Sequence, residues 1–306
     1  MTGTPTSFLT LLCLGLAASI RAVSPGEGPR FHGLPETEIA RSLAALHKAH
    51  PKWPERFEAV SAAFLGIPYK LGPMGEGPEG EFDRSPTHTF KELDCTTYVE
   101  EAMALSLESD LDRAKALLQK IRYKDGKVSY ETRNHFTEVD WRASLEAAGF
   151  LKEITRDVAG GRTGVIHKPI SKRAWHTAHT LQDVKGFADL TQPELEAKLK
   201  RMQELGAQFQ DEISTITYVP LAVLPEVLDR IPSATVGNLV REVRPDKPVA
   251  ITHQILFVVK DGRRFVRHAN YGHEVEEVPA EKFFARYDGA SWRVLGVNLE
   301  QVRDRR

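Results

Sequence analysis

Cysteine is scarce in this chain, occurring twice in 306 residues, at Cys13 and Cys95. Cys13 lies in an apolar N-terminal run that we expect to be removed, which leaves Cys95 without an intramolecular partner. A framework of disulfides is therefore excluded. Lipid attachment at Cys13 is also excluded, because Leu11 and Leu12 precede it and apolar sequence continues beyond it. A single thiol in an exported protein needs a chemical explanation.

The chain also has no excess of either charge: it contains 41 basic and 42 acidic residues, and its net charge is -1. No basic surplus points to nucleic acid or to a membrane surface, and no acidic tail is present. The hydrophobic content of 41% suffices for one large core or two small ones. Since no repeat, low-complexity tract or second linker interrupts the chain, we expect one catalytic α+β domain over residues 36–306. The sequence implies no protein partner.

Long apolar runs are absent except at the N-terminus, where residues 8–20 are uncharged and apolar. Such a run is shorter than the roughly 20 residues that cross a bilayer, but it matches the core of a signal peptide. Residues 1–7 lack the usual positive charge. We expect a signal peptide over residues 1–22, a Pro/Gly-rich linker over 23–35, export to the periplasm, and no stable membrane insertion.

The stretch "KELDCTTYVE" (91–100) predicts a helix that begins at Cys95. Asp94 is a favoured N-cap residue, and Thr96 and Thr97 suit a first turn. The apolar positions that follow fall on one helical face. The positive end of the helix would lower the pKa of the thiol and favour a thiolate. The alternative is a buried structural cysteine, and a neighbouring base must decide between the two.

Other segments also show clear patterns. Helices are predicted over residues 36–50, 54–65, 139–148 and 193–209 and from Leu111, and strands dominate from Ile213 onward. The helix over 193–209 is interpreted as a packing helix. Residues 66–86 form a long Gly/Pro loop before the cysteine, and loops of this length inside a domain are more often functional than idle.

Two β-rich runs flank Asp261-Gly262 and predict a hairpin. With these two residues in the turn, pairing runs back from Lys260 and Arg263 until His253 and His268 lie diagonally on one face, roughly 7–8 Å apart at their α-carbons. Asn270 lies on the same face, which also carries apolar residues suited to covering by a helix. A nucleophile needs a base, and the base needs an orienting group. The hairpin therefore permits Cys95, His253 and His268 to fill these three roles.

Several motifs in series resemble a known family. "GIPY", "LDCTTYVEEAMAL", "IRY", "RNHF…DW", "ITYVP" and "THQILFVVKDG…RHAN" appear in this order. Together they resemble the N-acetylmuramoyl-L-alanine amidase-like family, a branch of the NlpC-type, papain-like cell-wall cysteine hydrolases. The likeness spans about residues 65–298.

The resemblance implies a papain-like NlpC-type α+β fold in which a helix-borne cysteine packs on an antiparallel sheet, with additional helices and loops. It implies Cys95 as nucleophile, His253 as base and His268 as orienter. The implied reaction is cleavage of the amide between N-acetylmuramic acid and L-alanine in peptidoglycan fragments. Two departures stand out: Asn238 replaces the Asp of a usual Gly-Asp turn, and the longer spacing from His253 to His268 leaves Asn270 as a rival orienter.

Further residues are candidates for substrate binding: Tyr69, Asp94, Arg133, Asn134, His135 and Asn270. Arg133 suits a bidentate contact to a carboxylate of the stem peptide or to a sugar substituent, the alternative being a solvated charge. Tyr69 suits a cleft wall or, alternatively, an ordinary core position. His176 and His179 have i, i+3 spacing but lack the further ligands that zinc requires. We therefore expect neither a metal nor a cofactor.

Two other functions remain open. Many relatives in the superfamily cut instead between D-glutamate and diaminopimelate, on the same catalytic groups. The chain is alternatively a non-catalytic cell-wall binding module in which Cys95 is merely packed. The products formed from muropeptides and the effect of Cys95→Ala discriminate among the three.

Overall fold

The computed structural model describes residues 28–304. The predicted signal peptide (1–22) and the start of the predicted linker (23–27) lie outside these residues, and the domain boundary at residue 36 stays a prediction. The remaining linker residues pack against the fold, because Phe31 is buried with its ring edge-on to Phe64 (5.1 Å) and Phe90 (5.6 Å). No helix of the described residues is long and apolar enough to cross a membrane.

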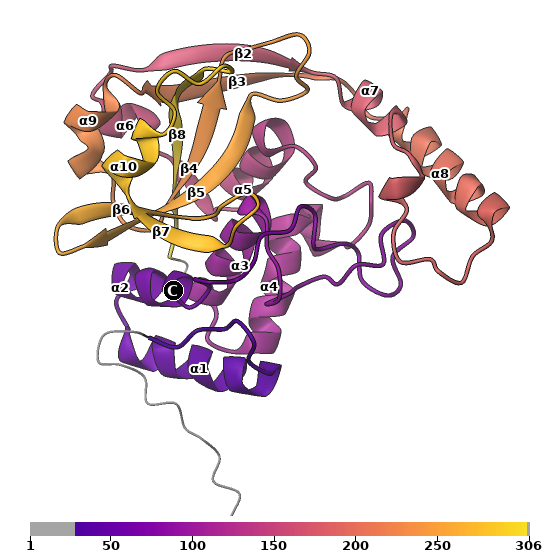
Figure 1. Ribbon diagram of the computed structural model, residues 1–306, viewed down its shortest axis with the longest axis horizontal. Helices are drawn as coiled ribbons and strands as arrows, with labels where there is room; N and C mark the ends of the chain where they lie inside the picture. The colour runs from indigo at the N-terminus through magenta and orange to yellow at the C-terminus, as the bar shows by residue number, and fades with distance from the viewer. Residues whose placement is uncertain (1–27, 305–306) are drawn as a thin grey trace, which may run out of the picture.

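One antiparallel sheet of eight strands organises the molecule (Figure 1). Seven strands follow the order β2-β3-β8-β4-β5-β6-β7, and β1 pairs separately with β8. The strands are β1 (Leu151–Glu153), β2 (Gly164–Ile170), β3 (Glu212–Pro220), β4 (Thr235–Arg241), β5 (Ile251–Lys260), β6 (Arg263–Ala269), β7 (Val275–Pro279) and β8 (Val294–Val302). The predicted α+β class is confirmed.

Four helices form a layer on one side of this sheet (Figure 1): α2 (Trp53–Ala62) and α3 (Cys95–Leu107) pack on the sheet, and α1 (Glu36–Ala49) and α4 (Leu111–Arg122) pack on these two helices. Their apolar sides form one core with Val236, Leu256 and Val258 of the sheet. In α3 almost every residue after the first turn is buried. The helix that carries Cys95 is therefore held rigidly between α2, α4 and the sheet.

The opposite face is covered by short helices: α6 (Thr155–Ala159), α9 (Leu224–Val227), η4 (Leu228–Arg230) and α10 (Ala280–Ala285). Ile255, Phe257 and Val266 pack there against Phe283 and Phe284 of α10. This is the face that also carries His253 and His268. As predicted, a helix covers this face. That helix is α10, whereas α3, which begins at Cys95, covers the other face.

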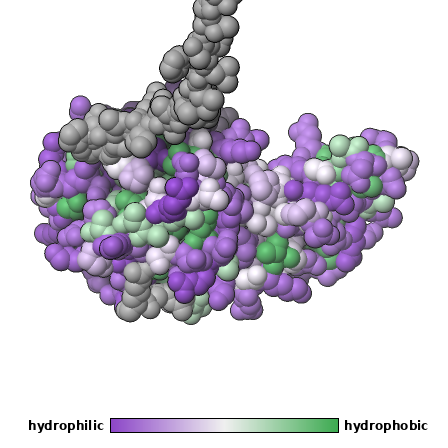
Figure 2. All heavy atoms as spheres, turned by 90° about the horizontal axis from the view of Figure 1, so that it is seen from below, coloured by the Kyte–Doolittle hydropathy of each residue, from purple (hydrophilic) through white to green (hydrophobic). Residues whose placement is uncertain are grey.

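A lobe extends from the body. It consists of α7 (Lys172–Thr177), η3 (Leu181–Asp183) and α8 (Gln192–Gly206), reached through the long β2–β3 pair. Met202 and Leu205 of α8 pack on Phe82 of the Gly/Pro loop and on Tyr130. Seen from below, the lobe stands out beside the body, and apolar side chains are scattered among polar ones (Figure 2). The predicted packing role of α8 is thus confirmed.

The predicted helices are confirmed, with one difference. Where one helix was expected over residues 139–148, the chain forms a π turn, η2 (Thr137–Trp141), followed by the short α5 (Arg142–Ala147). The carbonyl of Phe136 accepts hydrogen bonds from both Asp140 (2.9 Å) and Trp141 (3.0 Å), which widens this turn. A short 3-10 turn, η1 (Lys124–Gly126), precedes this region.

Candidate active site

Asp94 determines where α3 begins and how the preceding loop lies. Its Oδ1 accepts a hydrogen bond from the backbone N–H of Thr97 (2.8 Å), and the Thr97 hydroxyl accepts one from the backbone N–H of Asp94 (2.9 Å). Its Oδ2 accepts the backbone N–H of Gly72 in the Gly/Pro loop (2.9 Å). The predicted N-cap is confirmed. Since both carboxylate oxygens are engaged, Asp94 positions Cys95 and the loop.

Cys95 lies at the N-terminus of α3 and keeps part of its surface open to solvent. Its sulfur accepts hydrogen bonds from the backbone N–H groups of Gln254 and Thr96. The ladder between β5 and β6 ends at the pair Leu256 and Arg267, which leaves the amide of Gln254 available to the thiol. Gln254 directly follows His253, so the thiol lies beside the predicted base.

The two histidines contact each other directly. His253 Nε2 lies 2.9 Å from His268 Nδ1, with the ring planes at 88°. The predicted hairpin register is confirmed from Lys260 and Arg263 as far as the pair Leu256 and Arg267. This register depends on the Asp261-Gly262 turn, where both residues have positive φ (49° and 75°) as a two-residue hairpin loop requires.

A fourth group, Glu276 on β7, completes the chain of contacts. It lies directly across the ladder from His268, and its Oε1 accepts a hydrogen bond from His268 Nε2 (3.1 Å). Arg286 donates to the same oxygen (3.0 Å), and so does the amide of Asn270 (3.3 Å). Asn270 therefore contacts Glu276, and the group that contacts His253 is His268. Sequence reasoning missed Glu276, although a turn at Gly272, which has a φ of 76°, places residue 276 opposite 268.

These contacts fix the positions of the protons. Burial raises the pKa of Glu276, but its hydrogen bond from Arg286 and the neighbouring charges outweigh this and lower it, so the carboxylate is ionised and only accepts. His268 therefore carries its proton on Nε2, and its Nδ1 accepts the Nε2–H of His253. The remaining nitrogen of neutral His253, Nδ1, is left unprotonated as a base.

The environment keeps the resting groups neutral. Burial lowers the pKa of His253 to about 3, and the neighbouring His268 and Arg241 act in the same direction. Burial also lowers the pKa of His268 to about 4, against the opposing effect of Glu276. Dense packing around the sulfur raises the pKa of Cys95 to about 11, and the charge of Asp94 adds to this. The predicted lowering of the thiol pKa by the helix terminus is wrong, because burial and Asp94 outweigh it.

Tyrosines surround this thiol. Tyr69 is half-buried, its pKa is raised by burial and by the nearby charges of Cys95 and Asp94, and its ring lies edge-on to Tyr271 at 5.1 Å. Tyr271 is 76% exposed. The charge of Cys95 also contributes to the raised pKa of Tyr287, after burial as the main cause. Tyr69 thus lies near the cysteine and also packs against the main core, and its contact with substrate stays a prediction.

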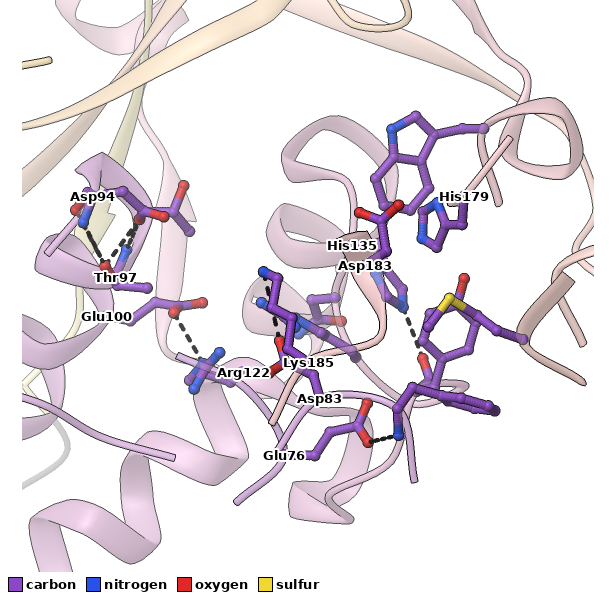
Figure 3. A pocket seen from close by; sticks show the side chains of 17 residues that line it. Glu76, Asp83, Asp94, Thr97, Glu100, Arg122, His135, His179, Asp183 and Lys185 are labelled. Atoms are coloured by element: carbon purple, nitrogen blue, oxygen red, sulfur yellow. Dashed lines mark hydrogen bonds and ion pairs between the residues drawn. The ribbon is translucent and has the colours of Figure 1, made fainter. Parts of the chain in front are cut away.

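A cavity of about 310 Å³ begins at the residues on either side of Cys95, Asp94 and Thr96, and runs toward the lobe. In Figure 3, Asp94 and Thr97 lie at one end of it and His179 at the other. Cys95, His253 and His268 do not line it, so the cavity lies next to the helix terminus that carries Cys95.

The predicted residues Arg133, Asn134 and His135 all line this cavity. The Asn134 amide is engaged at both ends, donating to the carbonyl of Ile121 (3.1 Å) and accepting from Ser144 (3.1 Å). His135 Nε2 lies 2.7 Å from the carbonyl of Tyr130. Of these three, Arg133 keeps the most hydrogen-bonding capacity for a ligand.

Between residues 28 and 304, no group of three or more His, Cys, Asp or Glu side chains is arranged to hold a metal ion. His176 is buried, with Nδ1 at 2.5 Å from the hydroxyl of Tyr130 and its ring stacked on Phe209. These contacts give His176 a packing role.

The chain is similar to known proteins. The model of the N-acetylmuramoyl-L-alanine amidase-like family matches residues 59–288. No curated protein matches the chain. Among solved structures, the chain is similar to a protein of Legionella pneumophila, with a TM-score of 0.79 and 26% identity over 87% of this chain and 95% of that chain.

An N-acetylmuramoyl-L-alanine amidase of Bacteroides uniformis shares the fold, with a TM-score of 0.58 and 21% identity over 81% of this chain and 98% of that chain. The family match covers most of the sequence. On this evidence the chain belongs to the N-acetylmuramoyl-L-alanine amidase-like family.

Proposed function

We propose that this protein is a cysteine amidase that hydrolyses the amide between N-acetylmuramic acid and L-alanine in peptidoglycan fragments. The observation that carries the proposal is the position of the Cys95 helix against the strand that carries His253, which in turn contacts His268. The Cys95 thiol accepts the backbone N–H that follows His253, and His253 bonds His268 at 2.9 Å. A nucleophile, a base and an orienting group in this order are the parts that acyl transfer needs.

The neutral resting state defines the first chemical step. As the sulfur attacks the amide carbonyl, His253 Nδ1 takes the thiol proton and acts as a general base. The first N–H groups of an α-helix have no carbonyl partner in their own helix, so the backbone N–H of Cys95 is available to the oxyanion. Ionised Glu276, acting through His268, stabilises the positive charge that develops on His253.

The remaining steps restore the enzyme. The imidazolium of His253 donates its proton to the nitrogen of L-alanine, the C–N bond breaks, and the stem peptide leaves while the muramoyl group stays as a thioester on Cys95. Neutral His253 then removes a proton from water, which attacks the thioester carbonyl. Collapse of this second intermediate releases the muramic acid carboxylate and returns the proton to the sulfur.

Two alternatives use the same residues. A D-glutamyl-diaminopimelate endopeptidase would place a different bond over Cys95, and a non-catalytic cell-wall binding module would leave the thiol unused. Family membership favours the amidase, while the hydrogen bond between His253 and His268, on a strand that α3 contacts, favours catalysis over binding alone. We further propose a papain-like NlpC-type fold and export to the periplasm, where the substrate is found.

Defined muropeptides separate these functions. The purified protein is incubated with anhydro and reducing muropeptides, and the products are identified by liquid chromatography and mass spectrometry. We expect free disaccharide and an intact stem peptide beginning with L-alanine. A stem peptide shortened to L-alanyl-D-glutamate would establish the endopeptidase instead, and no product from any muropeptide would support the binding module.

A further inference from the structure

The cavity beside Cys95 presents both signs of charge. Its basic residues include Arg133 and Lys185, and its acidic residues include Glu76, Asp83 and Asp183. In Figure 3, Lys185 and Asp83 lie in the middle of the cavity and His179 lies beyond them. A cavity of this kind suits a ligand that carries a carboxylate and an ammonium group close together.

Other charged residues of the cavity are already paired within the protein. Glu100 accepts the indole N–H of Trp141 (3.1 Å) and lies 3.3 Å from Arg122, and all three are buried. Asp94 caps α3 and holds the Gly/Pro loop. These groups form the wall next to Cys95 and offer little to a ligand.

Arg133 and Asp183 keep free capacity. The guanidinium of Arg133 donates to the carbonyl of Met74 (3.2 Å), and its charge acts on the nearby Glu76, opposing the rise of that carboxyl's pKa by burial, without an ion pair closer than 4.0 Å among residues 28–304. One oxygen of Asp183 accepts the backbone N–H of Thr180 (2.8 Å), which leaves the other for a ligand. Both side chains are half-buried, so their charges are screened less than charges on an open surface.

The lobe adds the outer wall. Trp175 and His179 lie with their rings 4.5 Å apart, and Met202 of α8 joins them. His179 has its pKa lowered by burial and is neutral near pH 7, so it adds no third cation. The lobe therefore encloses the end of the cavity that is farthest from Cys95 and shields its charges from water.

The two sides of the proposed scissile amide differ in charge. The muramic acid sugar is uncharged, whereas the stem peptide carries carboxylates and, with a diamino acid as third residue, an ammonium group. The charged cavity thus matches the stem peptide, and the uncharged Tyr69–Tyr271 pair, which does not line it, is left for the sugar.

We propose that this cavity binds the leaving stem peptide and selects a third residue that carries both a carboxylate and an ammonium group at its far end. Arg133 binds the carboxylate and Asp183 binds the ammonium. This inference rests on the proposed amidase reaction for its orientation across Cys95. Diaminopimelate has both groups, L-lysine lacks the far carboxylate, and 2-aminopimelate lacks the far ammonium.

The test compares kcat/KM for muramoyl tripeptides that differ only in these third residues. For the unaltered protein we expect diaminopimelate to exceed L-lysine and 2-aminopimelate by roughly 10- to 100-fold each, the range for hydrogen bonds to charged groups. Arg133→Gln should abolish the preference over L-lysine, and Asp183→Asn should abolish the preference over 2-aminopimelate. Arg173→Gln, an exposed arginine of α7 outside the cavity, is the matched control and should change neither.

Calorimetric binding of the free tripeptide L-alanyl-D-glutamyl-diaminopimelate to the Cys95→Ala protein gives a readout independent of activity. We expect the tripeptide to bind and Arg133→Gln to weaken this binding by a similar factor. That result supports the proposed role of the cavity even if no muropeptide is cleaved. Only the amidase proposal would then fail. Equal turnover of the three substrates, preferences unchanged in both variants, or no binding of the tripeptide would overturn the inference.

Discussion

Replacing Glu276 with glutamine removes one negative charge at the end of the histidine chain. The hydrogen bonds of 3.1 and 2.9 Å and the imidazole between them separate the Glu276 carboxylate from His253 by about 8 Å. At an effective dielectric constant of about 20, this charge stabilises an imidazolium at His253 by ~2 kcal/mol. Arg286 cancels part of that effect. We therefore expect Glu276→Gln to lower kcat about 10- to 30-fold, with little change in KM.

Glu276→Leu removes the acceptor as well as the charge. The Nε2–H of His268 then loses its partner, which costs about 1–3 kcal/mol and releases the constraint on both tautomers. We expect kcat to fall by a further factor of about 10 or more. Nitrogen-15 spectra of labelled histidines should show the Nε2–H form of neutral His253 and His268 in the unaltered protein and in Glu276→Gln, and a mixture in Glu276→Leu.

The matched control is Glu274→Gln, an exposed glutamate in the turn before β7, which should keep full activity. If both Glu276 variants retain the kcat of the unaltered protein, or if the histidine tautomers do not respond to Glu276→Leu, the assignment of protons along this chain is wrong.

Three further predictions follow from burial. With its pKa raised by burial to about 11, Cys95 should react with iodoacetamide at a rate that rises about tenfold per pH unit from pH 7 to 10. Asp94→Asn keeps an N-cap but removes the charge that helps raise this pKa, so alkylation at pH 8 should quicken with little change in stability. Burial raises the pKa of Glu101 to about 8, so the folded state holds a proton that the unfolded state releases, and this contribution to stability falls as pH rises from about 4.5 to 8. The gain in unfolding free energy from Glu101→Gln should therefore grow between pH 5 and 8, by at most about 1.4 kcal/mol per pH unit, in urea titrations.

A specific result would contradict each of these three predictions. An alkylation rate that is flat from pH 5 to 9 would mean a thiolate–imidazolium pair in the resting site. Slower alkylation in Asp94→Asn would contradict the role of the Asp94 charge. A stability difference for Glu101→Gln that does not depend on pH would show that Glu101 is ionised in the folded protein throughout this range.

The hairpin was predictable because its turn is only two residues long. Asp261-Gly262 permits one register, and a one-residue slip would reverse the face of every side chain, so the relation of His253 to His268 follows from local sequence. The start of α3 was predictable for a similar reason, since Asp94 and Thr97 form a reciprocal cap within four residues.

Long-range features were not predictable in this way. The turn between β6 and β7 brings Glu276 to His268, but its sequence lacks a two-residue pattern typical of a hairpin turn. Arg286, which also contacts Glu276, lies beyond the end of α10. The thiol pKa depends on packing from β5, which no local pattern specifies. The lobe was also not predictable from the sequence. Its position at the end of the cavity depends on contacts between α8 and Phe82 of the Gly/Pro loop, which are far apart in the chain.

Turnover of a muramoyl tripeptide by the Cys95→Ala protein shows whether Cys95 is the nucleophile, with circular dichroism and tripeptide binding as checks that the fold and the cavity are intact. We expect the unaltered protein to release the stem peptide and Cys95→Ala to release none above background. Stem-peptide release at an undiminished rate by a folded Cys95→Ala protein would contradict this role of Cys95.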